Sequence, residues 1–96
     1  MTEIIWSSQA SLEYWNNINY LLEEWTIKEA SAFVDKVEEL IEQLKTGNII
    51  FKPTNREDIY HVVVVKQITL FYKVQTNIIT LLRFWNNYQD PQKLTL

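Results

Sequence analysis

His61 is the one histidine of the chain, and an ordinary pKa of about 6.5 makes it the side chain best suited to acid–base chemistry near neutral pH. The chain has no Cys, so it lacks a thiol nucleophile, and one His cannot assemble a zinc site. Its single glycine, Gly47, cannot form a glycine-rich phosphate loop. These features disfavour thiol, metallohydrolase, kinase and dehydrogenase chemistry. We therefore expect no metal and no cofactor.

The charged side chains are divided unevenly between the two halves of the chain. Residues 1–46 carry nine acidic and three basic side chains, a net charge of −6, whereas residues 47–96 carry three acidic and six basic ones, a net charge of +3. A polyanion would therefore meet the second half. A solvated, Glu-rich helical surface explains the acidic first half equally well.

Length and composition indicate one domain that spans residues 1–96. The chain is 47% hydrophobic and 22% charged, which is sufficient for a single two-layer core. Its first residues lack the basic and apolar segments of a signal peptide. No apolar run approaches the length of about 18 residues that spans a bilayer. We therefore expect a cytoplasmic protein without a membrane contact.

The first 25 residues predict a short strand followed by a helix. Residues 4–6 are apolar with β propensity, and Ser7 or Ser8 can cap the following helix through its hydroxyl oxygen. Apolar side chains then recur every three or four residues, at Ala10, Tyr14, Ile18, Leu21, Leu22 and Trp25. The opposite, polar side of this helix is expected to carry Asn16, Asn17, Asn19, Glu23 and Glu24.

A second helix is predicted directly after the first. Thr26 and Glu29 fit a capping box at its start, and Gly47 stands where a left-handed C-cap is expected. Its apolar stripe comprises Ala30, Phe33, Val34, Val37, Leu40, Ile41 and Leu44. Because only a tight turn separates the two helices, they should form an antiparallel hairpin.

The second half of the chain predicts a loop and three strands. Residues 47–58 contain Gly, Pro, Asn and charged residues, which is typical of a connecting loop, and the apolar residues 49–51 should pin it to the core. The strands cover residues 59–65, 68–74 and 78–85, where β-branched and alternating apolar residues occur. The links between these strands are short enough to make both connections hairpins, which gives an antiparallel meander.

The element order predicts a two-layer α+β fold, β-α-α-β-β-β. Each helix has one apolar stripe and must bury it, so the antiparallel helical hairpin should pack on one face of a mainly antiparallel four-stranded sheet. No predicted element remains to cover the other face, which an antiparallel sheet tolerates. That open face should carry charged and aromatic side chains, and it is the expected functional surface.

The order and spacing of several segments resemble the RelE/ParE superfamily of small bacterial toxins, over almost the whole chain. The segments are Ile5-Trp6-Ser7 with Ala10, the stripe from Phe33 to Leu44, Tyr60-His61-Val62, Leu70-Phe71-Tyr72-Lys73-Val74, and Leu81 through Pro91 with Lys93-Leu94. Toxins of this kind belong to type II toxin–antitoxin pairs and are held inactive by an antitoxin encoded beside them. Some cleave mRNA in the ribosome, whereas others poison DNA gyrase. The resemblance therefore implies an antitoxin partner and the ribosome or gyrase as target, and it is compatible with a homodimer.

The resemblance also implies roles for particular residues. Ribonuclease members place phosphate-binding or proton-transferring groups where this chain has His61 and Tyr88, although a basic residue is expected at both positions. RNA cleavage by 2′-hydroxyl attack needs a proton acceptor, a proton donor and a cation beside the phosphate. On this interpretation His61 and Tyr88 are catalytic, and Lys66, Lys73 or Arg83 binds phosphate.

Structural interpretations of the same residues remain open. His61 could simply pair across the sheet, and the Tyr88 hydroxyl could anchor the C-terminal turn. Phe84 and Trp85 are interpreted as core residues or as partner-binding contacts with the antitoxin, rather than as a platform for bases.

Three functions therefore compete at this stage. The chain could be a ribosome-dependent, metal-independent endoribonuclease, or a gyrase inhibitor that binds without chemistry. The acidic helical hairpin and the loss of the Arg that is expected where this chain has Tyr88 fit the inhibitor slightly better. The third function is a catalytically inactive relative that serves as an antitoxin-binding or structural module.

Overall fold

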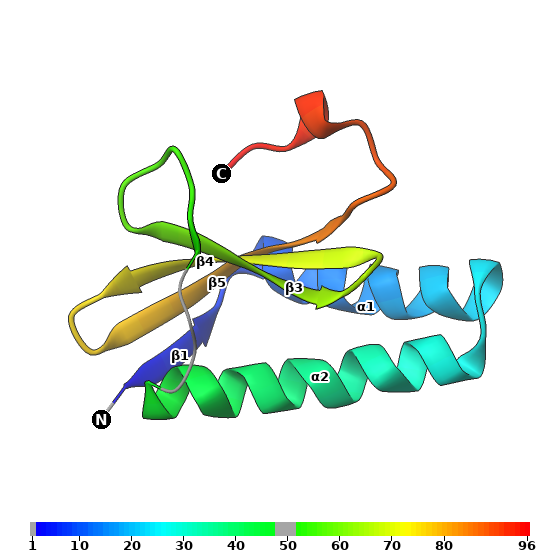
Figure 1. Cartoon of the computed structure of the whole chain (residues 1–96), viewed down its shortest axis with the longest axis horizontal. Coiled ribbons are helices and arrows are strands. Elements are labelled where there is room, and N and C mark those ends of the chain that lie inside the picture. The colour runs from blue at the N-terminus through cyan, green and yellow to red at the C-terminus, as the bar shows by residue number, and fades with distance from the viewer. Residues whose placement is uncertain (1, 48–51) are drawn as a thin grey trace.

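The computed structural model describes residues 2–47 and 52–96, which form two helices and a sheet that lies across them (Figure 1). The predicted core contacts of residues 49–51 lie outside the described residues. The elements are β1 (Glu3–Trp6), α1 (Ser8–Glu24), α2 (Ile27–Thr46), β2 (Lys52–Pro53), β3 (Ile59–Val65), β4 (Ile68–Gln75), β5 (Ile78–Asn86) and a 3₁₀ turn, η1 (Pro91–Lys93).

The helices begin and end at the residues that the sequence predicts. The Ser7 hydroxyl accepts a hydrogen bond from the Ala10 amide at 2.9 Å, and the Thr26 hydroxyl accepts one from the Glu29 amide at 3.3 Å. Both contacts satisfy an amide of the first helical turn. Gly47 adopts φ +75°, the left-handed conformation that ends α2. The two helices form the predicted hairpin.

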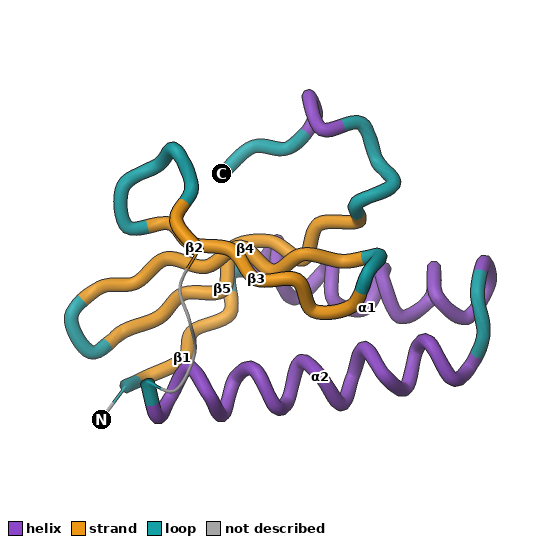
Figure 2. The backbone as a smooth tube through the Cα atoms, viewed as in Figure 1, coloured by secondary structure: helices purple, strands orange, loops and turns teal. Residues whose placement is uncertain are grey.

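The sheet has five strands rather than the predicted four, in the order β1-β5-β4-β3-β2 (Figure 2). β1 pairs with β5 in parallel, and the other pairs are antiparallel. The α+β class is confirmed. The added strand, β2, pairs Lys52 with His61 and Pro53 with Tyr60, within the segment that was predicted to be a loop.

A tight turn explains why this segment doubles back as a hairpin. The Thr54 amide and hydroxyl both donate to the Ile59 carbonyl, at 3.1 and 2.9 Å. The Thr54 hydroxyl also accepts from the Arg56 amide at 3.0 Å, and Asp58 adopts φ +64°. Pro53 fits an outermost strand, because an edge strand does not need every backbone donor.

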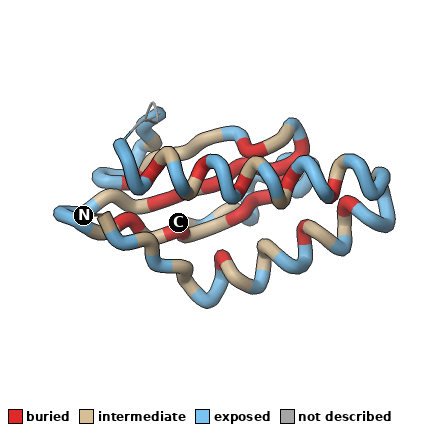
Figure 3. Tube along the Cα trace, turned by 90° about the horizontal axis from the view of Figure 1, so that it is seen from below, coloured by how far each residue is buried: buried red, intermediate tan, exposed pale blue. Residues whose placement is uncertain are grey.

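The core lies between the helical hairpin and the sheet, where the buried residues of both layers face one another (Figure 3). Phe33 of α2 and Phe84 of β5 meet edge to face, with ring centroids 5.9 Å apart. Tyr14 packs against both rings, at 5.5 and 5.8 Å. Tyr72 is fully buried on the same face, and burial, followed by the nearby Tyr60, raises its pKa to about 12.

Asn17 was predicted to face solvent, and the structure shows that this is wrong. β1 pairs only with residues 78–81 of β5, so the edge of β5 beyond them needs other partners. Asn17 Nδ2 donates to the Phe84 carbonyl at 2.8 Å, and Glu13 Oε1 accepts from the Phe84 amide at 3.1 Å. These side chains are four residues apart and lie on one side of α1. They replace the backbone of a missing strand, so Asn17 is buried.

The prediction that nothing covers the opposite face of the sheet is also wrong in part. The segment after β5 arches over that face (Figure 1). Arg83 Nη1 donates to the Thr95 carbonyl at 2.7 Å, and Arg56 Nη1 donates to the Leu96 carbonyl at 3.5 Å. Trp85 is only 6% exposed although it belongs to no part of the main core. The C-terminal segment therefore closes part of the face.

Candidate functional site

Four side chains form a row across the face of the sheet that points away from the helices. The strand register aligns Lys52 with His61, His61 with Phe71, and Phe71 with Arg83. Their chain neighbours Tyr60, Val62, Leu70, Tyr72 and Phe84 pack in or against the core, and side chains alternate between faces. The His61 and Phe71 rings lie 5.9 Å apart. We call these four residues the His61 row.

The cation at the end of this row, Arg83, is already bound within the chain. Its Nε and Nη2 atoms donate to the two carboxylate oxygens of Glu13, at 2.9 and 2.7 Å. Both side chains are only 14% exposed. The hydrogen bonds that Arg83 donates to Glu13 raise the pKa of Arg83, burial lowers it, and the carboxylate charge raises it further. With Nη1 held by Thr95, three of its nitrogen atoms already have acceptors.

Tyr88 lies in a different cluster, beyond the end of β5. Its ring stacks on Trp25 with a centroid separation of 6.1 Å, and it is 61% exposed. Lys66 Nζ lies 4.6 Å from the centroid of the Trp25 ring, a cation–π contact. Trp25 Nε1 in turn donates to the Tyr20 hydroxyl at 3.2 Å. Two predicted site residues, Lys66 and Tyr88, are therefore brought together by their common contact with Trp25, not by a contact with His61.

The two proposed catalytic side chains are separated along the sheet. The His61 row crosses β4 at Phe71, whereas the end of β5 nearest Tyr88 pairs Asn86 with Ile68. Three residues of strand correspond to about 10 Å. The described contacts of His61 and Tyr88 include no shared partner. The structure therefore does not bring the predicted proton acceptor and proton donor together.

Two lysines lie nearer to His61 than Tyr88 does. Lys52 is directly opposite His61 in the register, and Lys73 follows Phe71 by two residues on the same face of β4. Directly opposite side chains have Cβ atoms about 5 Å apart, and diagonal ones about 7 Å. Within residues 2–47 and 52–96, neither lysine forms an ion pair.

Sequence reasoning missed Lys52 and Glu13 as parts of this face. Lys52 fell in the predicted loop, and only a hairpin formed by residues 52–61 could have placed it beside His61. Glu13 falls on the polar side of α1, where a carboxylate usually contacts water. The available signal was that Glu13 and Asn17 have helical spacing on the side next to an unpaired strand.

The predicted partner-binding residues, Phe84 and Trp85, are both buried. Phe84 is 1% exposed among the core aromatic rings. Trp85 points to the other face, where the Arg83 guanidinium carbon lies 5.4 Å from its ring centroid. A partner could contact either ring only after the surrounding side chains or the C-terminal segment moved.

The described residues contain no group of three or more His, Cys, Asp or Glu side chains with the arrangement of a metal site. Their helices are also too short or too polar to cross a membrane.

Comparison with known protein families defines the class of this protein. Residues 4–91 match the family model of the ParE toxin of the type II toxin–antitoxin system parDE. The match covers most of the chain, so the chain belongs to this toxin family, and its predicted membership of the RelE/ParE superfamily is confirmed. None of the curated protein sequences matches it.

Solved structures of toxin–antitoxin proteins share the fold. A chain of the chromosomal ParDE system from P. aeruginosa superposes with a TM-score of 0.72 at 13% identity, covering 90% of this chain and 96% of that one. The YoeB dimer from Staphylococcus aureus gives 0.61 at 18% identity, covering 91% and 98%. The DinJ–YafQ complex from E. coli gives 0.62 at 13% identity, covering 90% and 93%. At these identities the similarity establishes the fold.

Proposed function

We propose that this toxin inhibits growth by binding DNA gyrase, without cleaving RNA. The observation that carries the proposal is the state of the predicted ribonuclease centre. Arg83 is held by Glu13 and Thr95, and His61 and Tyr88 belong to separate clusters. RNA cleavage needs a proton acceptor, a proton donor and a cation around one phosphate. A toxin that acts by binding alone has no such requirement.

We also propose that an antitoxin partner holds the toxin inactive in the cytoplasm. The family is defined by type II toxin–antitoxin pairs, and the DinJ–YafQ toxin–antitoxin complex from E. coli contains a chain of the same fold. A homodimer is the other proposed assembly, since YoeB of Staphylococcus aureus has been solved as a dimer.

Ribosome-dependent mRNA cleavage is the second proposed function, and one feature favours it. His61 has Lys52 directly opposite and Lys73 diagonally adjacent on the same face. A histidine between two unpaired lysines could exchange a proton beside a bound phosphate. Tyr88 would then need to approach from the neighbouring cluster.

Expression of the chain alone in a bacterial host distinguishes these functions. Under the gyrase proposal we expect growth arrest, intact mRNA by primer extension, and inhibition of DNA supercoiling by purified gyrase. His61→Ala and Tyr88→Phe should both remain toxic. Lys45→Ala, an exposed change near the end of α2 at a residue that belongs to neither cluster, is the control.

The opposite results identify the alternatives. Cleaved mRNA, slowed at least about tenfold in both His61→Ala and Tyr88→Phe, would replace the gyrase proposal with the ribonuclease. Normal growth with soluble protein would instead favour an inactive module that only binds the antitoxin.

A further inference from the structure

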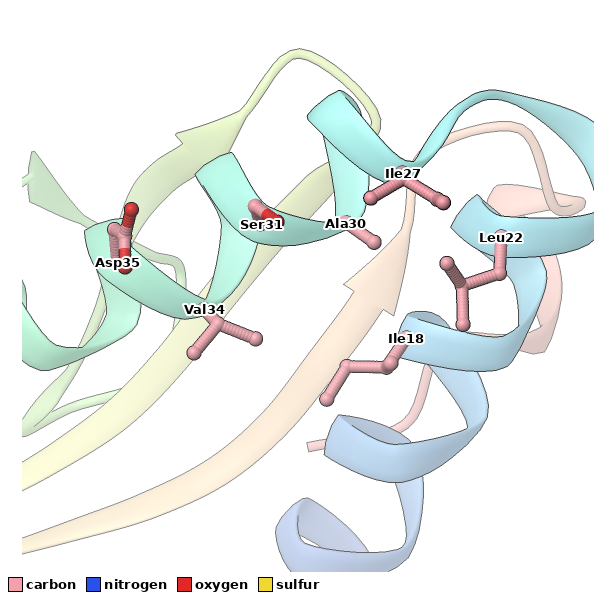
Figure 4. Close-up of a pocket in the computed structure, with 7 residues that line it drawn as sticks. All are labelled: Ile18, Leu22, Ile27, Ala30, Ser31, Val34 and Asp35. Atoms are coloured by element: carbon pink, nitrogen blue, oxygen red, sulfur yellow. The ribbon is translucent and has the colours of Figure 1, made fainter.

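A small polar pocket with a volume of about 120 Å³ lies between α1 and the end of β5. Its walls differ from those of the apolar groove between α1 and α2, where Ile18 and Leu22 face Ile27 and Val34 (Figure 4). Five of the side chains that line the polar pocket are amides: Gln9, Asn16, Asn17, Asn86 and Gln89. The volume is about that of four water molecules in the liquid, so the pocket has room for one small ring rather than for a drug-sized molecule.

Two of these amides are buried, and each has one end free. Asn17 and Asn86 are 5% and 8% exposed. Asn17 Nδ2 donates to the Phe84 carbonyl, and Asn86 Oδ1 accepts from the Tyr88 amide at 2.9 Å. Because these backbone partners fix the orientation of both amides, Asn17 Oδ1 is left as an acceptor and Asn86 Nδ2 as a donor. Among the described residues neither atom has a hydrogen-bond partner, and both remain accessible to solvent.

Glu13 adds a second acceptor beside Asn17. Its carboxylate accepts three hydrogen bonds, two on Oε1 and one on Oε2. A carboxylate has about four acceptor sites, so Oε2 can accept one more. The charge of Glu13 is already balanced by Arg83, and no other charged side chain of the described residues lines the pocket. These features favour a neutral ligand.

The three groups follow one another along the edge of β5. Glu13 contacts the Phe84 amide and Asn17 contacts the Phe84 carbonyl, whereas Asn86 comes two residues later on the same face of the strand. The pocket therefore offers an acceptor, an acceptor and a donor in this order. The Watson–Crick edge of guanine is complementary, because its 2-amino group, N1–H and O6 present a donor, a donor and an acceptor. Cytosine, uracil and adenine would each place an acceptor against an acceptor of the pocket.

We infer that this pocket binds a guanine base through its Watson–Crick edge. The base has two possible sources, a free nucleoside or nucleotide and an unpaired guanine of a nucleic acid. The net charge of −6 on residues 1–46, which include α1, disfavours the second source. The inference goes beyond the proposed function, because the pocket includes neither His61 nor Tyr88 and binding to gyrase does not require it.

The 5′-monophosphates of guanosine, inosine and adenosine test the inference, because they share the sugar and the phosphate and differ only in the base. Inosine lacks the 2-amino group of guanosine and keeps N1–H and O6. NMR titration that follows the side-chain NH₂ signals of Asn17 and Asn86 should give a dissociation constant of about 1 mM or lower for the guanosine compound. The inosine compound should bind about tenfold more weakly, and the adenosine compound more weakly still. Guanosine without phosphate should bind as tightly as its monophosphate, because the pocket offers no free cation.

A variant in the chain locates the binding site. Asn86→Asp keeps an acceptor for the Tyr88 amide but removes the donor that O6 of guanine requires, so binding should weaken at least about tenfold. Asn19→Asp is the matched control, because it adds the same charge at an exposed site of α1 that does not line the pocket. This control should bind like the wild type. Circular dichroism checks that both variants remain folded.

Two RNA pentamers, UUGUU and UUAUU, separate the sources of the base. Binding of UUGUU that is tighter than that of guanosine monophosphate and is lost in UUAUU would support guanine recognition and assign the base to a nucleic acid. Binding of UUGUU that is no tighter would support the free nucleoside or nucleotide.

Three results would overturn the inference. They are equal binding of the guanosine, inosine and adenosine compounds, unchanged Asn17 and Asn86 side-chain signals throughout the titration, and an equal loss of binding in Asn86→Asp and Asn19→Asp. None of these measurements depends on growth arrest or on gyrase. A failure here would therefore leave the proposed function untouched, and a non-toxic chain that binds guanine would refute only the proposed function.

Discussion

The two faces of the sheet are held by different forces. On the helix side, Phe33, Phe84 and Tyr72 are buried in an apolar core. On the other side, a partly buried ion pair between Glu13 and Arg83 and a hydrogen bond to Thr95 connect α1, β5 and the C-terminal segment. The stabilisation that comes from burying apolar side chains changes little with salt. The strength of a polar contact near the surface depends on its partner atoms and on screening by the solvent.

This difference changes the interpretation of the second half's positive charge. The sequence predicts that the cations of the exposed sheet face bind a polyanion, but the charge of Arg83 is already neutralised by Glu13 within the chain. Exposed apolar side chains and an apolar groove lie instead on the acidic helical hairpin.

Truncating the core should have the largest effect on stability. Phe33 is fully buried and packs against Tyr14 and Phe84, so Phe33→Ala removes apolar contacts and leaves a cavity. We expect a loss of about 3–5 kcal/mol in the free energy of unfolding, measured by urea denaturation. A loss below about 1 kcal/mol would mean that the helix side is not the main source of stability.

Breaking the ion pair of the other face should cost somewhat less. Glu13→Ala leaves the Arg83 guanidinium without its carboxylate and the Phe84 amide without its acceptor. Both partners retain some solvent contact, so we expect a loss of about 2–3 kcal/mol in urea denaturation. The control is Glu23→Ala, an exposed site on the same helix. If Glu13→Ala and Glu23→Ala lose the same free energy of unfolding, the contacts of Glu13 with Arg83 and Phe84 do not contribute to stability.

Alkaline pH should weaken the helix side through Tyr72. Its folded-state pKa of about 12 lies above the ordinary value of 10.0, so the folded protein holds this proton more tightly than the unfolded chain. The corresponding stability is present below pH 10 and is lost as the pH rises towards 12, by about 2 kcal/mol.

Denaturation at several pH values, compared between the wild type and Tyr72→Phe, isolates this loss from other titrating groups. Absorbance near 295 nm should show one late-ionising tyrosine fewer in Tyr72→Phe than in the wild type, because Tyr14, whose pKa burial also raises, is present in both proteins. Identical pH profiles for the two proteins would contradict the assignment to Tyr72.

Deleting residues 94–96 should have the smallest effect on stability. The deletion removes the acceptors of Arg83 and Arg56 in the C-terminal segment, both of them exposed contacts. We expect a loss of at most about 1 kcal/mol. Quenching of tryptophan fluorescence by acrylamide should nevertheless increase, because Trp85 becomes accessible. Unchanged quenching would mean that the segment does not cover this ring.

Local signals predicted the fold, whereas tertiary contacts decided the site. The caps at Ser7, Thr26 and Gly47, together with the apolar periodicities, were sufficient to place both helices and the meander. Each of these signals acts within a few residues, so it can be read from the sequence directly.

The errors arose where distant segments meet. Helical spacing places Asn17 among the solvent-facing residues. Because the pairing of β1 with β5 ends before Phe84, the Phe84 carbonyl lacks a strand partner, and Asn17 is buried where it donates to this carbonyl. Likewise, the neutralisation of Arg83 joins residues 70 positions apart in sequence. The separation of Tyr88 from His61 depends on strand register and on a ring contact with Trp25, neither of which has a local signature.

Glu13 and Asn17, the α1 side chains that hydrogen-bond to β5, also determine where another β-strand could join this protein. Exposed strand edges recruit further strands, in aggregation as well as in recognition. Glu13 and Asn17 occupy the amide and carbonyl of Phe84, which closes that stretch of β5 to strand addition. An incoming extended peptide is left with the outer borders of the sheet at β1 and β2.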